Sequence, residues 1–277
     1  MRSRLILTVL VAGLSLAIAA PNAEADTACA AGKTLQEGKL TVATGNPAYF
    51  PWVLDNDPAA GKGFEAAVAY EVAKRMGFSK EQVAWTSASF DQSIQPGPKD
   101  FDFNLQQFSI TAEREKVVDF SAPYYAAAMV VLVRKPTVEG GATATLGSLK
   151  TLKWGVVANT TALPMVQSVI APEADPLLYD DNTNAVEAMK ANQIDAAIFD
   201  LPTALYLSAV VLEDGVVLGQ FPAERSENPD QFGLLMAEGS PLKSCVDAAL
   251  TAMTDDGTLA AIEAQWLQET TGVPVIK

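Results

Sequence analysis

Residues 100–125, DFDFNLQQFSITAEREKVVDFSAPYY, carry the features that decide the fold and the site. The apolar beginning has the character of a strand, the polar segment after it predicts a bend, and a short charged helix and an aromatic loop follow. Thr111 is a suitable N-cap for that helix, which places Arg114 in the first turn. Because the first turn carries partial positive charge, an arginine there is unfavourable unless an anion binds beside it.

Arg114 allows two interpretations. The planar guanidinium fork suits a carboxylate, and free N–H groups at the helix start would help to bind it. Alternatively, Arg114 forms a surface ion pair with Glu113, Glu115 or Asp119. The sequence alone favours neither.

The first 25 residues have the character of a signal peptide. Two arginines precede an apolar run over residues 5–20, and Ala23-Glu24-Ala25 matches a small-x-small cleavage site. A membrane anchor is the alternative, but the apolar run is on the short side for a span of about 20 residues. We therefore expect an exported, periplasmic protein that is cleaved near Ala25.

The composition excludes several classes of function. The 277-residue chain has a net charge of −14, and loss of Arg2, Arg4 and Glu24 with the signal peptide leaves 17 basic and 32 acidic residues, a net charge of −15. Such an excess of acid argues against nucleic acid and anionic membrane as partners. The chain contains no histidine, the commonest general base and metal ligand, so we expect no catalytic residues, no metal and no cofactor.

The two cysteines, Cys29 and Cys245, suggest one disulfide in an exported protein. This bond would tie the N-terminal segment to a late helix. Lipidation of Cys29 is the alternative, but the charged Asp26 interrupts the hydrophobic segment that a lipoprotein signal needs. The disulfide is the favoured interpretation.

Two β–α–β patterns follow one another, which predicts two α/β lobes. The first has strands at 39–44 and 83–87 around a helix over 64–76, and the second has strands at 154–158 and 194–199 around a helix over 184–192. Further strands are expected at 130–134, 216–221 and 232–237, a surface loop at 136–148, a polar linker at 224–230 and two helices toward the C-terminus.

The predicted lobes are 37–127 with 238–277, and 128–237, joined by crossovers near 126–128 and near Phe232. Ligands of such sheets bind beyond the carboxyl ends of the strands. That rule selects five loops, which span 46–52, 87–91, 107–114, 158–162 and 200–203.

Several side chains in these loops suit a zwitterion. Asp200 follows a strand and could accept an ammonium group, although Asp before Leu201-Pro202 is also a good helix N-cap. Thr160 and Thr161 could donate to an anion or simply cap a helix. Tyr49, Trp52 and Phe90 could wall an apolar slot or fill gaps in the core. A guanidinium and a carboxylate on different lobes would hold the carboxylate and ammonium of one ligand.

The chain resembles the polar amino-acid binding proteins of bacterial ABC importers (solute-binding protein family 3) from about residue 35 to the C-terminus. The matching motifs are Ser109-Ile110-Thr111-x-Glu113-Arg114, Val118-Asp119-Phe120-Ser121-x-Pro123-Tyr124-Tyr125, Tyr49-x-Pro51-Trp52, Gly63-Phe64-Glu65, Asp195-Ala196 with Asp200-x-Pro202, and Asp256-Gly257-Thr258-Leu259.

The resemblance implies an α/β, two-lobe (type II) periplasmic binding protein with a ligand cleft between the lobes. It implies that Arg114 binds the ligand α-carboxylate and that Asp200 binds the α-amino group. The further ligand-binding residues that it implies are Ser109, the backbone at Gln107, Thr160, Thr161, Tyr49, Phe90, Asn46 and Glu65. The expected partners are an amino acid and the ABC permease subunits, and the expected state is a monomer.

Three positions depart from the family pattern. Ala67 replaces a usual second acid, Asn159 replaces a common glycine before the threonines, and Asn46 stands where relatives that bind basic side chains often have Asp. The last departure argues against a cationic ligand. A periplasmic cyclohexadienyl dehydratase on the same fold is an alternative function, for which Glu65 would be the acid. A detached sensor domain ranks lower, since no effector domain follows.

Overall fold

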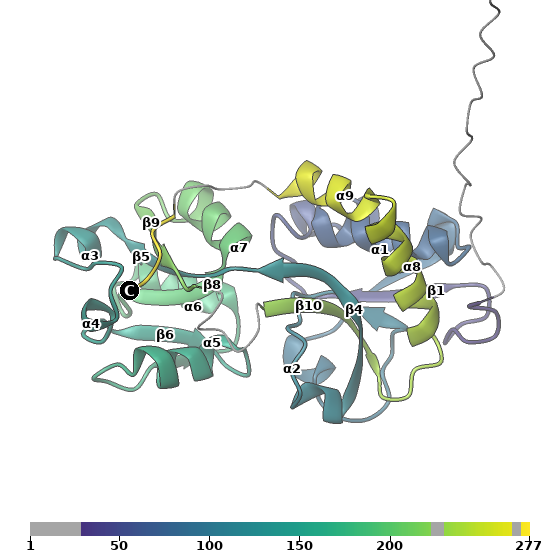
Figure 1. Cartoon of the computed structure of the whole chain (residues 1–277), viewed down its shortest axis with the longest axis horizontal. Helices are drawn as coiled ribbons and strands as arrows, with labels where there is room; N and C mark the ends of the chain where they lie inside the picture. Colours follow the sequence, from purple (N-terminus) through teal and green to yellow (C-terminus); the bar gives the residue numbers. More distant parts are fainter. Residues whose placement is uncertain (1–28, 223–229, 268–272) are drawn as a thin grey trace, which may run out of the picture.

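A computed structural model describes residues 29–222, 230–267 and 273–277 of the chain. These residues form two lobes, each with a mixed five-stranded sheet and covering helices (Figure 1). The expected two-lobe α/β fold is confirmed. The predicted signal peptide lies outside the described residues, and among the residues described no helix is long and apolar enough to cross a membrane.

The first lobe contains the sheet β2-β1-β3-β10-β4. Its strands are β1 (Leu40–Thr44), β2 (Val83–Ser87), β3 (Phe103–Asn104), β4 (Val118–Ala127) and β10 (Asp230–Ala237). β1 pairs in parallel with β2 and β3, as the β–α–β pattern predicts, whereas β10 runs antiparallel to β3 and β4. The lobe's helices are α1 (Phe64–Arg75), α2 (Phe90–Ser93), α8 (Lys243–Asp255), α9 (Thr258–Trp266) and the 3₁₀ turns Leu54–Asn56, Pro58–Ala60, Lys80–Gln82 and Arg114–Lys116.

The second lobe contains the sheet β7-β6-β8-β5-β9. Its strands are β5 (Met129–Arg134), β6 (Trp154–Val157), β7 (Leu177–Tyr179), β8 (Ala196–Asp200) and β9 (Gly215–Gln220). Its helices are α3 (Lys135–Glu139), α4 (Leu146–Leu149), α5 (Ala162–Pro164), α6 (Asn182–Lys190) and α7 (Leu201–Tyr206), with π-helical turns at Met165–Ile170 and Leu207–Val211.

Strand β5, which lies between β8 and β9 in this sheet, contributes to two apolar clusters. Because side chains alternate along β5, Val131 and Val133 enter one cluster and Val130 and Leu132 enter the other.

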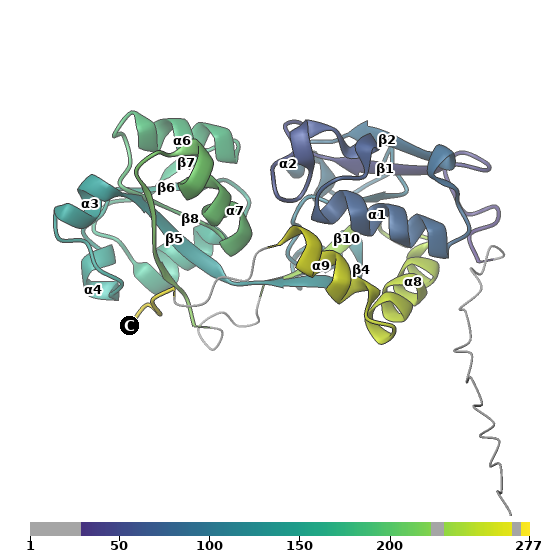
Figure 2. The same cartoon turned by 90° about the horizontal axis from the view of Figure 1, so that it is seen from above.

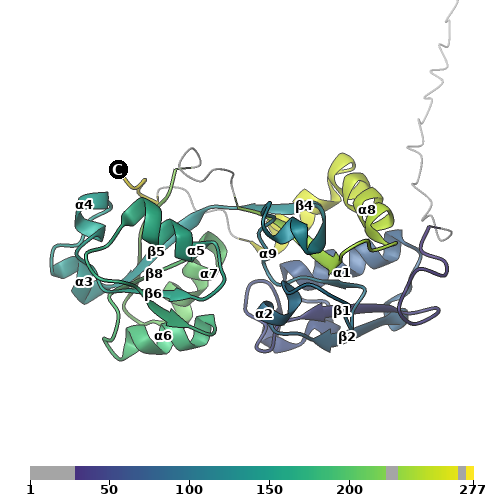
Figure 3. The ribbon, with the colours of Figure 1, turned by 90° about the horizontal axis from the view of Figure 1, so that it is seen from below.

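The two lobes have separate apolar clusters, and strand β4 leads from the first lobe toward the second. β4 runs out of the first sheet toward the second lobe, where β5 begins after Ala128 (Figures 1 and 3). This agrees with the crossover expected near 126–128. The return connection joins β9 to β10 and includes residues 223–229, outside the described residues, so most of the predicted polar linker falls there.

The sheet topology corrects the predicted lobe boundaries. Asp230–Ala237 was assigned to the second lobe, but this strand pairs with β3 and β4 of the first. The end of the chain was assigned to the first lobe, yet Val275 bridges to Gln220 of β9 and Ile276 is buried in the second lobe's core. Periodicity predicts a strand but does not identify its neighbour, because pairing depends on residues far away in sequence.

Two local expectations were also wrong. Residues 119–125 belong to strand β4 and not to an aromatic loop, and Pro123 is tolerated there because it lies at a register shift opposite Gly233. The expected surface loop at 136–148 contains α3 and part of α4, with Pro136 in the first turn of α3 and Thr145 capping α4 through Ser148 N.

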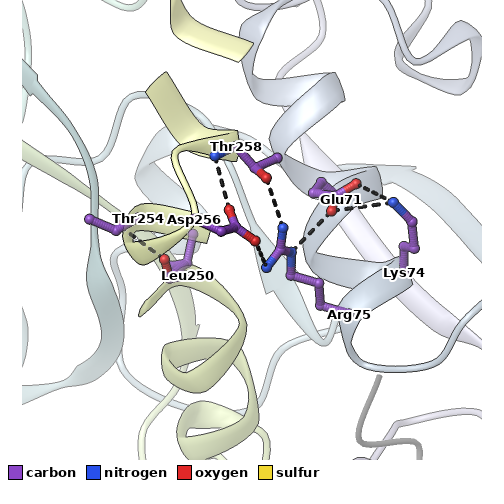
Figure 4. Close-up of polar contacts among 7 residues, drawn as sticks. All are labelled: Glu71, Lys74, Arg75, Leu250, Thr254, Asp256 and Thr258. Atoms are coloured by element: carbon purple, nitrogen blue, oxygen red, sulfur yellow. Dashed lines mark hydrogen bonds and ion pairs between the residues drawn. The ribbon is translucent and has the colours of Figure 1, made fainter. Parts of the chain in front are cut away.

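The C-terminal helices α8 and α9 lie beside α1 in the first lobe (Figure 2). Arg75 at the end of α1 joins them, since its guanidinium contacts Asp256 Oδ2 at 2.8 Å, Glu71 Oε1 at 3.0 Å and Thr258 Oγ1 at 2.9 Å (Figure 4). The predicted disulfide between Cys29 and Cys245 is present and ties the start of the described chain to α8. A disulfide-bonded Cys29 has no free thiol for lipidation.

Candidate functional site

A cavity of about 380 Å³ lies between the lobes, at the carboxyl ends of β1, β2, β6 and β8. It is lined by Asn46, Pro47, Tyr49, Ser89, Phe90, Asp91, Gln106, Gln107, Ser109, Arg114, Met129, Val157, Thr160, Thr161, Ala162, Asp180, Asp181, Asn182, Ile198, Phe199, Asp200 and Phe232. All five loops selected from the sequence contribute to this wall. The structure therefore brings together residues that are up to 186 positions apart, from Asn46 to Phe232.

Arg114 is a buried cation in this wall, with 9% of its surface exposed. Its Nη1 donates to the carbonyl oxygen of Ser109 at 2.7 Å, and its Nη2 donates to the carbonyl oxygen of Asn159 at 2.9 Å. The guanidinium carbon lies 5.2 Å from the ring centroid of Phe90. Burial lowers the pKa of Arg114 to about 10, and the negative charge of Asp230 opposes that shift.

No carboxylate of the described residues lies within ion-pair distance of Arg114. The alternative, a surface pair with Glu113, Glu115 or Asp119, is not formed: Glu113 pairs with Lys116 at 2.7 Å, and Asp119 Oδ2 accepts from Ser240 N at 3.0 Å. Thr111 was expected to be the N-cap, but the helix is a single 3₁₀ turn whose N-cap is Glu113; the Oγ1 of Thr111 accepts from Arg114 N at 3.2 Å. Arg114 thus retains N–H groups and charge for a ligand anion.

Asp200 occupies both positions that its sequence context suggested, the start of a helix and the wall of the cavity. It is the N-cap of α7, where Oδ1 accepts from Thr203 N at 2.8 Å, and it also lines the cavity. Burial raises the pKa of Asp200 to about 6, although hydrogen bonds from Thr203 favour the charged form. A bound ammonium group would stabilise the carboxylate further.

The hydroxyl groups of Ser109, Thr160 and Thr161 lie along the wall between the lobes. Thr161 Oγ1 donates to Asp230 Oδ2 at 3.2 Å and lies 3.5 Å from Ser109 Oγ, so it touches the first lobe from the second. Thr160 Oγ1 instead donates to the carbonyl oxygen of Val157 at 2.7 Å. The Thr160 hydroxyl is therefore already bonded within its own loop.

The aromatic residues divide between the wall and the core. Tyr49 and Phe90 line the cavity as expected, and Phe90 stacks on Phe108 with centroids 4.7 Å apart. Trp52 is fully buried in the first lobe's core, and its Nε1 donates to Thr203 Oγ1 at 2.8 Å. Asn46 lies at the rim, where its Oδ1 accepts from Asn56 Nδ2 at 3.2 Å.

Glu65, an expected ligand contact, does not line the cavity. It is 1% exposed and lies behind Gln107, accepting from Gln107 N at 2.8 Å, from Gln107 Nε2 and from the hydroxyl of Tyr124. Burial raises the pKa of Glu65 to about 7, against the effect of these hydrogen bonds. Glu65 holds Gln107, whose φ of 50° is unusual for a residue other than glycine, and so shapes the wall from behind.

Sequence reasoning did not identify the polar segment Asp180, Asp181 and Asn182 of the second lobe, which lines the cavity. These residues follow β7, a three-residue strand at the edge of its sheet with largely exposed leucines. Neither alternation nor an apolar run marked this strand, so the rule on strand ends could not be applied to it. Asp181 could have been recognised as a cap, since it accepts from Asn184 N at the start of α6.

The comparisons with known proteins agree with this architecture. The sequence profile of the bacterial extracellular solute-binding proteins, family 3, matches residues 40–269. The L-cystine-binding protein TcyJ of Escherichia coli (strain K12) is 28% identical, over 84% of each chain, and the ABC transporter arginine-binding protein 1 of the same strain is 29% identical, over 75% of this chain and 82% of that protein. The crystal structure of an ancestral amino acid-binding protein, a precursor of cyclohexadienyl dehydratase, is similar with a TM-score of 0.66 and 25% identity, over 83% of this chain and 96% of that one.

Proposed function

The chain belongs to the bacterial extracellular solute-binding proteins, family 3, and on this premise we propose that it binds a free α-amino acid between its lobes and delivers it to an ABC permease. Relatives with this task bind cystine and arginine. The proposal places the protein in the periplasm as a monomer, after cleavage near Ala25.

Arg114 is the observation that carries the proposal. Among the described residues, the buried guanidinium donates to carbonyl oxygens and lies over an aromatic ring, and although the negative charge of Asp230 acts on it, no carboxylate forms an ion pair with it. The α-carboxylate of an amino acid supplies that charge in the geometry that the fork prefers. Ser109, Thr161 and the backbone at Gln107 border the same part of the cavity wall and would complete the carboxylate site.

Asp200 is proposed to bind the α-amino group from the second lobe. Because the two ligand charges then contact different lobes, binding favours the conformation in which the lobes are closed. The connection at Ala128 between β4 and β5 is the proposed hinge. Tyr49 and Phe90 would enclose the ligand side chain, with Asn46 at the rim.

The dehydratase alternative has weaker support. It needs an acid that protonates a leaving hydroxyl group, and Glu65, the residue considered for that role, lies behind the cavity wall. Incubation of the purified protein with prephenate and with arogenate tests this alternative, and formation of the dehydrated product would contradict our assignment as a binding protein.

Isothermal calorimetry and thermal shift with each of the twenty common amino acids and cystine would test the main proposal. We expect saturable binding of at least one of them, with a rise in melting temperature. Mass spectrometry of the native protein as purified would identify a retained ligand. No heat and no thermal shift with any of these compounds would contradict the proposal.

A further inference from the structure

Asn159 contacts the first lobe twice from the second. It follows β6 with a left-handed φ of 60°, a conformation that Asn adopts more readily than most residues. Its side-chain Nδ2 donates to Asp91 Oδ1 of α2 at 3.0 Å. Its carbonyl oxygen accepts from Arg114 Nη2 at 2.9 Å. One residue of the second lobe therefore contacts both a surface acid and the buried guanidinium of the first.

We propose that Asn159 is a positioning residue that couples closure of the lobes to binding of the ligand carboxylate by Arg114. This inference rests on the proposed function. The Asn159 amide fastens the second lobe to Asp91, and the Asn159 carbonyl fixes the guanidinium that faces the cavity. Asn159, for which the sequence suggested no role in the site, thereby links closure of the lobes to binding of the ligand carboxylate.

The donor arrangement of Arg114 explains how the coupling works. A guanidinium has five N–H groups, and the carbonyl oxygens of Ser109 and Asn159 engage one on each terminal nitrogen. The Ser109 contact stays within the first lobe, whereas the Asn159 contact requires the second lobe to be near. When the lobes separate, Nη2 loses this partner and the guanidinium is held only by its contacts with Ser109 and Phe90 in the first lobe. Closure thus orients the remaining donors before the ligand carboxylate binds.

Other contacts between the lobes do not involve Arg114. Tyr49 and Thr183 approach to 3.2 Å through their hydroxyl groups, and Trp52 Nε1 donates to Thr203. Among the hydrogen bonds of the described residues, the bond to the Asn159 carbonyl is the one that joins the Arg114 guanidinium to the second lobe. The effect of removing one of these other contacts can therefore be compared with the effect of substituting Asn159.

Asparagine at position 159 forms the hydrogen bond to Asp91 and also adopts the left-handed backbone conformation. Glycine could adopt the same backbone conformation but has no side chain to reach Asp91. Glycine adopts a left-handed φ at no steric cost and would keep the carbonyl near Arg114. It would lose the amide that reaches Asp91. Asn159→Gly therefore removes the side-chain part of the coupling and leaves the backbone conformation accessible, and Asp91→Ala removes the same hydrogen bond from the other side.

Small-angle scattering of the ligand-free protein tests the closure part of the proposal without any ligand. We expect Asn159→Gly and Asp91→Ala each to increase the radius of gyration, and the double variant to show no further increase, because both changes break one bond. Circular dichroism confirms folding, and Asp91→Ala carries the test if Asn159→Gly does not fold. A radius equal to that of the wild type in both variants would overturn the proposal.

Titration with L-arginine, L-glutamine and L-cystine, each separately, tests the coupling to ligand binding. For any of these probes that binds the wild type, we expect Asn159→Gly to weaken the affinity roughly fivefold to tenfold. Thr183→Val removes an interlobe contact that does not involve Arg114 and is expected to weaken the affinity less. Equal effects of the two variants would overturn the role of Asn159. If none of the probes binds the wild type, the failure concerns these ligands, and the scattering measurement still decides the closure part.

Discussion

Two arginines of the first lobe, Arg75 and Arg114, have opposite surroundings. Arg75 at the junction of α1, α8 and α9 contacts two carboxylates and a hydroxyl group (Figure 4). Burial lowers its pKa, but the hydrogen bonds with Asp256 and Glu71 outweigh burial and leave the pKa above its ordinary value. Arg114 is more deeply buried and contacts two carbonyl oxygens and an aromatic ring, so burial dominates and its pKa falls to about 10.

This difference separates an arginine that stabilises the fold from one that is prepared for a ligand. The charge of Arg75 is already neutralised by side chains of the chain itself, so a ligand would gain little by approaching it. The charge of Arg114 forms no ion pair with a carboxylate of the described residues, and a bound anion would offset the cost of burying this charge. Substitutions at and around the two arginines should therefore have distinct consequences for affinity and for stability.

Arg114→Ala is expected to produce the largest effect. The ligand carboxylate would lose its charged partner, and we expect the binding free energy to weaken on the order of 3–5 kcal/mol, measured by calorimetry with an amino acid that binds the wild type. The melting temperature of the ligand-free protein should change less than the affinity, because relief of the burial of the charge offsets part of the loss of the hydrogen bonds to Ser109 and Asn159. Unchanged affinity would contradict the assignment of Arg114 to the ligand carboxylate.

The pH dependence of Asp200 is expected to have opposite signs for stability and for binding. Burial raises its pKa from 3.8 to about 6, so the folded state holds this proton more tightly than the unfolded state. The associated stability, on the order of 3 kcal/mol, is fully present below pH 4 and is lost as the pH rises through about 6. An ammonium ligand needs the charged form, so affinity should instead fall as the pH drops below about 6.

Asp200→Asn should remove the fall of affinity below pH 6 and the part of the pH dependence of stability that Asp200 contributes, and it should leave the part due to Glu65. Chemical denaturation of the ligand-free protein and calorimetry between pH 4.5 and 8, about the range that the shifted pKa defines, would measure them. Arg75→Ala is the matched control that should retain the wild-type change of affinity with pH. An affinity that still falls in Asp200→Asn as the pH drops below 6, as in the wild type, would contradict contact with the ligand ammonium.

Glu65→Ala is expected to weaken both stability and binding, because Glu65 supports the wall without touching the cavity. Loss of its carboxylate leaves the backbone N–H of Gln107 and the hydroxyl of Tyr124 without their buried acceptor, which costs about 2 kcal/mol. Urea denaturation would measure this cost. The matched variant Glu65→Gln retains an acceptor and the side-chain volume and should lose less. Wild-type stability in Glu65→Ala would show that the contacts behind Gln107 contribute nothing.

Arg75→Ala should have the smallest effect and one confined to stability. The side chain is partly exposed and its partner Asp256 is about half exposed, so we expect a melting temperature lower by only a few degrees. Affinity for the amino acid should equal that of the wild type. A loss of affinity comparable to that of Arg114→Ala would remove the distinction between the two arginines.

Much of the cavity wall could be predicted because the relevant signals are local. Hydrophobic periodicity located β1, α1 and β2 to within one residue, and the rule on strand ends then selected loops that all reach the cavity. The position of Arg114 in a capped turn was also a local signal. The roles of these residues toward a ligand remain proposals that the experiments above would test.

The missed features depend on contacts between distant parts of the chain. Glu65 and Gln107 are 42 positions apart, and Asp91 and Asn159 are 68 positions apart. Nothing in the local sequence of Glu65 indicates that its carboxylate turns away from the cavity. The short strand β7, which leads to the acidic residues Asp180 and Asp181, has too few residues to show a period.

The sequence by itself determined the two α/β patterns, the loops that could bind a ligand and the anomalous arginine, because spacing, caps and charge act within a few residues. Only the tertiary structure decided that β10 belongs to the first sheet, that Glu65 supports the wall from behind and that Asn159 reaches Arg114 and Asp91. These outcomes follow from packing between distant segments. That no carboxylate of the described residues forms an ion pair with Arg114 could be recognised only from the residues that the fold brings around it.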